Sequence, residues 1–191
     1  MNKQLKINKG FFTAIISAFS DLDASIDQQF VLRDKESQLL PLLYFTCLML
    51  LLSQLIEVTS QVQEEPYLSV ITAVVVSYLF FLPIFMYVLG FILHFILKIF
   101  GASSSSFQTR LALFWSLSVS TLIILVVSIT KIFISGTMEL VIVVLSELIM
   151  VYIFSRTVSF VSKFKDRNLF TFVVTSMYFI PVVLINFSSG I

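Results

Sequence analysis

An acidic residue within an apolar stretch has the clearest chemical potential in this sequence. Glu147 lies about two turns into the apolar run at residues 139–159. A charged side chain at the centre of a membrane helix costs roughly 2.5–3.5 kcal/mol on insertion scales. Its carboxylate is therefore expected to face other helices, to be protonated, or to accept a hydrogen bond. Lys131 lies near the same outer end of the preceding run, so it could reach either Glu147 or Glu139.

Glu147, Lys131 and Glu139 admit two interpretations. They could form a proton- or cation-linked site inside a helical bundle, or they could make a buried polar contact that holds the helices at residues 110–134 and 139–159 together. We favour the structural contact, because no second acid stands at helical spacing from Glu147 to build a proton relay.

Residue types that support metal binding or nucleophilic catalysis are isolated in this sequence. His94 is the single histidine and Cys47 the single cysteine, whereas a metal site needs several such ligands. There is no glycine-flanked nucleophilic serine and no phosphate-binding glycine loop. We therefore expect no enzymatic activity, no cofactor and no metal, and we expect His94 to lie at the level of the lipid headgroups.

The composition is that of a membrane protein. Hydrophobic residues make up 58% of the 191 residues, charged residues 12%, and the mean hydropathy is +1.02. Soluble domains are nearer half apolar and a quarter charged, so the sequence predicts an all-α, polytopic membrane helix bundle. The net charge of +1 argues against a nucleic-acid-binding protein.

Five apolar runs are long enough to cross a bilayer, which takes about 20 helical residues. They cover residues 39–56, 67–100, 110–134, 139–159 and 169–187, within a predicted transmembrane domain at residues 39–191. As a straight helix the second run would exceed about 45 Å, so it must tilt, project or bend. Pro83 is the expected bend, because it lacks a backbone donor and frees the carbonyl of Leu79.

Residues 1–38 are predicted to form short amphipathic helices at the membrane interface. Lysines at positions 3, 6 and 9 precede a short apolar cluster at helical spacing, too short to cross a bilayer. This cluster consists of Phe11, Phe12, Ile15, Ile16 and Phe19. Asp21 and Asp23 stand where a signal peptide would have its small-residue cleavage site, which disfavours that alternative. Either aspartate could cap a second short helix.

A polar turn at residues 98–110 separates the second and third runs. Gly101 and four serines end one helix, and Ser105 with Gln108 forms a capping pattern that starts the next. With the N-terminus in the cytoplasm, eleven of the twelve basic residues fall on the cytoplasmic side, and Lys131 is the exception. The predicted cytoplasmic surface for lipid or a partner comprises Lys98, Gly101, Phe107, Arg110, Arg156, Lys163, Lys165 and Arg167.

The turn at residues 100–107, FGASSSSF, resembles the Phe-Gly-Gly…Phe turn of the Yip family. These are five-span integral membrane proteins named for interacting with Ypt/Rab GTPases, and bacterial relatives share the domain. Ala102 stands where the family tends to have a second glycine. The resemblance implies a non-enzymatic membrane organiser or adaptor, in a bacterium one of the inner membrane.

The leading hypothesis is a membrane scaffold of Yip type. Its expected partners are the bilayer, including anionic lipids attracted at about 1 kcal/mol per basic residue, and a second copy or another membrane protein. The alternative is a small oligomeric transporter or channel component that uses Glu147 and Lys131 within its bundle.

Overall fold

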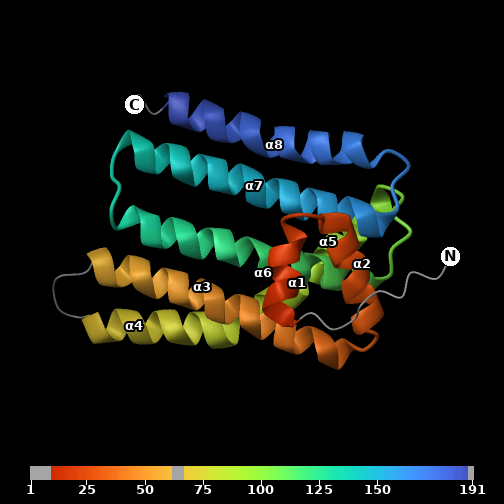
Figure 1. The fold of residues 1–191 in the computed structure, drawn as a ribbon, viewed down its shortest axis with the longest axis horizontal. Helices are drawn as coiled ribbons and strands as arrows, with labels where there is room; N and C mark the ends of the chain where they lie inside the picture. The colour runs from red at the N-terminus through yellow and green to blue at the C-terminus, as the bar shows by residue number, and fades with distance from the viewer. Residues whose placement is uncertain (1–9, 62–66, 189–191) are drawn as a thin grey trace.

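Long helices lie side by side along one axis of the molecule (Figure 1). The computed structural model describes residues 10–61 and 67–188. Neighbouring helices pack in the order α4, α3, α6, α7 and α8. Their bounds are α3 (Leu39–Gln61), α4 (Tyr67–Val76), α6 (Ser106–Lys131), α7 (Thr137–Ser162) and α8 (Arg167–Ser188). The prediction of an all-α bundle is confirmed for the described residues.

Within the described residues, four helical segments are long and apolar enough to cross a membrane. They are Glu36–Thr59, Leu68–Ile99, Ser106–Lys131 and Thr137–Ser162. The fifth predicted run is helical, as α8, but is not among these four. This length and composition are those of an integral membrane protein.

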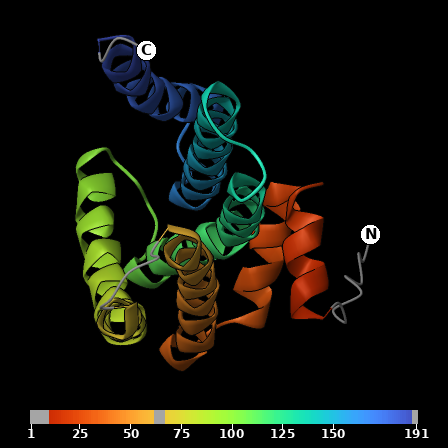
Figure 2. The same ribbon diagram turned by 90° about the vertical axis from the view of Figure 1, so that its left-hand side faces the viewer.

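The second apolar run bends, as predicted. It comprises α4, a π-helical turn η2 (Ser77–Phe81) and α5 (Leu82–Ile99), with Pro83 in the first turn of α5. The wider π turn lies directly before the proline, where the regular hydrogen-bond ladder is interrupted. Figure 2 shows the result, with α4 viewed nearly end-on and α5 crossing the view. The first part of the run therefore packs along α3, and the second crosses α6.

The N-terminal segment forms α1 (Phe11–Ala18), α2 (Leu22–Leu32) and the 3-10 turn η1 (Glu36–Gln38), and α1 and α2 lie across the long helices (Figure 1). Asp21 caps α2 by accepting from the backbone N–H of Ala24 at 2.9 Å, which confirms one of the two expected caps. The apolar cluster of α1 is divided between two sides of the helix. Ile15 is fully buried, whereas Phe12 and Ile16 are more than half exposed.

The core is built around α6, which packs against α1, α2, α3, α5 and α7. Phe114 and Trp115 are fully buried, and the ring of Phe11 from α1 stands edge-on to Trp115. Serines complete the packing, because Ser118 Oγ lies 2.8 Å from Thr46 Oγ1 on α3. The Ser118 hydroxyl also lies 2.8 Å from the carbonyl of Phe114 one turn earlier in α6, so it is satisfied within the core.

Candidate functional site

One end of the bundle gathers the α5–α6 turn, the α7–α8 turn and the start of α3, and we call it the basic end. The two turns are joined where Ser103 N donates to Ser162 O at 3.2 Å. Throughout residues 10–61 and 67–188, every lysine and arginine except Lys131 lies toward this end. Gly101 adopts a φ of 80°, a backbone conformation that favours glycine, which explains this residue in the α5–α6 turn. As predicted, Ser105 and Gln108 cap the start of α6 with reciprocal hydrogen bonds.

Arg110 is the most buried charge of the basic end. Its Nε and Nη2 each donate to a carboxylate oxygen of Glu36 at 2.9 Å, and its Nη1 donates to Ser106 Oγ at 2.7 Å. The guanidinium lies 4.4 Å from the centre of the Phe91 ring. Only 8% of the Arg110 side chain is exposed, so it ties η1, α5 and α6 together instead of facing lipid or a partner as the sequence predicted.

Gly90 on α5 makes room for this arginine. A Cβ atom at this position would stand 2.7 Å from Arg110 Cγ, closer than van der Waals contact allows. The glycine therefore lets the stem of Arg110 lie directly against the α5 backbone. The sequence analysis gave Gly90 no role, because an isolated glycine in a long apolar run carries no signal of what it accommodates.

Arg156 makes a second bidentate pair across the bundle. Its Nε and Nη2 donate to the two carboxylate oxygens of Asp23 at 3.0 and 2.8 Å, and its Nη1 donates to Asn168 Oδ1 at 2.9 Å. Arg167 Nη1 lies 3.6 Å from the same carboxylate. Asp23 thus links α2 to α7 and α8, and it was foreseen only as a possible cap.

Loss of the Asp23 carboxylate is expected to loosen α2. In Asp23→Asn, two arginines lose their shared counter-charge in a site where Asp23 and Arg156 are 30% and 26% exposed. We expect a loss of about 1–3 kcal/mol, the range for hydrogen bonds to charged groups. Thermal unfolding of the purified protein in detergent measures it. Asp27→Asn, the same change at an exposed position of α2, is the control, and equal effects of the two variants would contradict the assigned pair.

The predicted cytoplasmic surface is divided by these contacts. Lys98, Gly101, Lys163, Lys165 and Arg167 are exposed. Arg110 and Arg156 instead hold helices together, and Phe107 packs against the core. The exposed members therefore form the part of the basic end that a ligand or a partner could reach.

The predicted polar site of Glu147, Lys131 and Glu139 is not assembled in the structure. Lys131 Nζ lies 3.1 Å from Glu57 Oε1, and Ser128 Oγ donates to the same oxygen, so these residues join α6 to α3. Among the described residues, Lys131 forms no ion pair with Glu147 or Glu139. The first predicted span ended at residue 56, but α3 continues to Gln61 and carries Glu57 to the end of α6.

Glu147 makes its polar contact with α8. The hydroxyl of Tyr178 donates to Glu147 Oε2 at 3.0 Å, which joins α7 to α8. The contact is between helices, but it joins α7 to α8 and not α6 to α7, the pair expected from the sequence. A tyrosine hydroxyl one helix away lowers the cost of a carboxylate in an apolar surrounding.

His94 makes a buried contact between α5 and α6. It is 9% exposed, and its Nδ1 lies 3.3 Å from Thr109 Oγ1. Ser104 Oγ lies 3.2 Å from the same threonine oxygen. In the part of the chain that the structure describes, no group of three or more His, Cys, Asp or Glu side chains could hold a metal ion.

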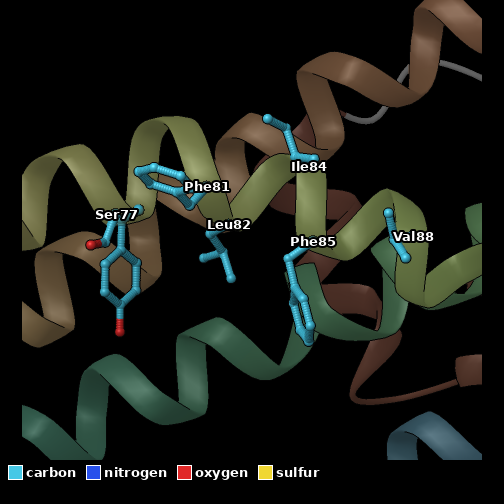
Figure 3. Close-up of a pocket in the computed structure, with 7 residues that line it drawn as sticks. Ser77, Phe81, Leu82, Ile84, Phe85 and Val88 are labelled. Carbon is cyan, nitrogen blue, oxygen red and sulfur yellow. The ribbon is translucent and has the colours of Figure 1, made fainter.

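The outer side of the bent helix carries an apolar hollow of about 630 Å³ (Figure 3). Figure 3 shows Phe81 and Leu82 at the junction of η2 and α5, with Phe85 further along α5. The hydroxyl of Tyr78, which also lines it, donates to Gln54 on α3 at 3.3 Å. The hollow therefore offers apolar contact area, while the Tyr78 hydroxyl beside it is already hydrogen-bonded to α3.

Comparison of the chain with family models, with curated proteins and with solved structures found no match. The likeness of residues 100–107 to the Yip turn therefore stays a prediction from the sequence. The contacts of the basic end are the evidence from which a function can be inferred.

Proposed function

We propose that this protein is a non-enzymatic scaffold or adaptor of Yip type in a bacterial inner membrane. It spans the bilayer five times, with the N-terminus in the cytoplasm and the basic end facing the cytoplasm. The distribution of basic residues supports this orientation, since lysine and arginine are concentrated in cytoplasmic segments of membrane proteins.

The observation that carries the proposal is the use of polar side chains at the basic end. The side chains best suited to chemistry each make a hydrogen-bond contact with a residue of another element. They are Arg110, Arg156 and His94. Lys98, Lys163 and Lys165 remain exposed around them. Rigid internal ties beneath an exposed, positively charged rim suit a surface that recruits a partner, because a pre-ordered surface loses less conformational entropy on binding.

Cysteine labelling tests the number of spans. In a Cys47→Ser background, we expect Ser103→Cys to react with a membrane-impermeant maleimide only after cells are permeabilised. Gly190→Cys should react on intact cells. The third, fourth and fifth predicted spans lie between positions 103 and 190, so the two positions should be on opposite sides of the membrane. Labelling of both positions under the same condition would contradict five spans, and labelling of position 103 alone on intact cells would contradict the orientation.

Site-specific photo-cross-linking tests the scaffold itself. A photoreactive amino acid at Lys98 or Lys163 is expected to capture a defined protein, either a second copy or another chain, in living cells. The same group at Phe133 or Met138, exposed positions at the opposite end of the bundle, is the control. Equal capture at both ends would contradict a partner-binding basic end. Solute movement into reconstituted vesicles that is lost in Glu147→Gln would favour the transporter instead.

A further inference from the structure

An apolar groove of about 600 Å³ opens on the side of the bundle next to the basic end. Helices α5, α7 and α8 form its walls, since α8 packs mainly on α7 and leaves space toward α5. The walls include Leu93, Phe100, Phe154, Val158, Val173 and Met177. Lys165 and Asp166, from the α7–α8 turn, also line the groove.

A polar cup of about 310 Å³ adjoins the groove at these two residues. Arg156, Lys165, Asp166, Arg167 and Asn168 line it. Because Lys165 and Asp166 line both hollows, the polar and apolar parts are continuous. A ligand that fits both must have a polar head and an apolar chain.

The charges of the cup favour an anion. Three cations line it with one carboxylate, Asp166, and a second carboxylate, Asp23, pairs with Arg156 and Arg167, so the cup keeps a net positive charge. Asp166 accepts from the backbone N–H of Leu169 at 3.0 Å, and Asp23 accepts from Arg156. Lys165 is exposed and, within the described residues, has no carboxylate within ion-pair distance. An incoming phosphate would therefore meet an ammonium group that has no counter-charge.

The length of the groove matches one leaflet of a bilayer. Its wall on α8 runs from Leu169 to Met177, which is about 12 Å along a helix. Half of the hydrocarbon core of a bilayer is about 15 Å. A chain that enters at Lys165 and follows α8 therefore stays within the leaflet on the side of the basic end.

We propose that the cup and groove together bind one anionic phospholipid, with its phosphate beside Lys165 and an acyl chain between α5 and α8. The inference rests on the proposed placement of α8 in the membrane, but not on the scaffold having a protein partner. The lipid would fill the space between α5 and α8 and so hold α8 against the bundle.

Lipid retention by the full-length protein in a neutral detergent tests this proposal. Native mass spectrometry should show one phosphatidylglycerol retained per protein after washing, and far less phosphatidylcholine under the same conditions. Phosphatidylglycerol at about 100 times its Kd should raise Tm by roughly 5–10 °C. Glycerol 3-phosphate, which carries the headgroup chemistry without a chain, should give less than a quarter of that rise.

Two pairs of variants assign the site. Lys165→Gln removes the unpaired cation and Val173→Trp fills the groove, and each should reduce retained phosphatidylglycerol at least threefold. Lys35→Gln makes the same charge change at an exposed position outside both hollows, and Phe172→Trp enlarges an exposed neighbour that does not line the groove. Both controls should retain lipid as the unmodified protein does.

Three outcomes would overturn the proposal. They are equal retention of the two lipids, unchanged retention in Val173→Trp, or full protection by glycerol 3-phosphate alone, which would indicate a soluble phosphate ligand. The measurement uses purified protein without a partner, so its failure leaves the scaffold untouched. Failure of the cross-linking experiment in turn leaves the lipid site untouched.

Discussion

Glu36→Gln is expected to destabilise the protein by about 2–3 kcal/mol. The change leaves Arg110, 8% exposed, without the carboxylate that receives two of its donors. Removing one partner of a fully buried ion pair costs about 3–5 kcal/mol, and a smaller loss is expected here because 48% of the Glu36 side chain is exposed. Thermal unfolding in detergent should show a fall in Tm of about 5–10 °C.

A double-mutant cycle separates the pair from a general effect of charge. Arg110→Met removes the buried cation, so Glu36→Gln should cost at least about 1 kcal/mol less in that background than alone. Asp34→Asn removes a negative charge from an exposed position two residues before Glu36 and should change Tm little. Strictly additive effects of the two changes at Glu36 and Arg110 would contradict the contact.

Gly90→Val is expected to cost a similar amount, about 2–3 kcal/mol. Overpacking of a well-packed contact costs about 1–3 kcal/mol, and here the added atoms also displace Arg110 from Glu36 and Phe91. The arginine cannot move aside at little cost, because the atom that clashes is Cγ, near the fixed end of the side chain. Thermal unfolding of the variant and of the unmodified protein in the same detergent measures the loss of stability.

Gly90→Ala provides a sharper test of the same contact. Whether this substitution stabilises or destabilises the protein should depend on the presence of Arg110. Alone it should destabilise, since the new Cβ meets Arg110 Cγ at 2.7 Å. In an Arg110→Ala background the obstacle is absent, and alanine in a helix should stabilise by up to about 1 kcal/mol over glycine. A change of the same sign and size in both backgrounds would show that Gly90 serves some other purpose.

The helices and their caps were predictable because they depend on local sequence. The Ser105–Gln108 cap, the Asp21 cap and the bend at Pro83 each involve residues within a few positions of one another. Apolar runs likewise locate long helices to within a few residues, as α6 and α7 show. Local patterns are sufficient for such features, since they satisfy the backbone groups of the segment itself.

The site could not be predicted in the same way because its contacts are distant in sequence. Glu36 and Arg110 are 74 residues apart, and Asp23 and Arg156 are 133 apart. No periodicity in either segment indicates which carboxylate a given arginine will meet. The pairing of Lys131 with Glu57 offered one usable signal, since α3 and α6 both start at the basic end and run parallel, which brings their ends together.

The distance in sequence between Asp23 and Arg156 has a consequence for how the molecule is made. A ribosome adds about 5–20 residues per second, so the 133 residues that separate the pair take on the order of ten seconds to synthesise. For that interval α2 exists without the arginine that fixes it to α7. Helix α2 therefore gains this contact only late in synthesis, and a nascent chain stopped before residue 156 lacks it.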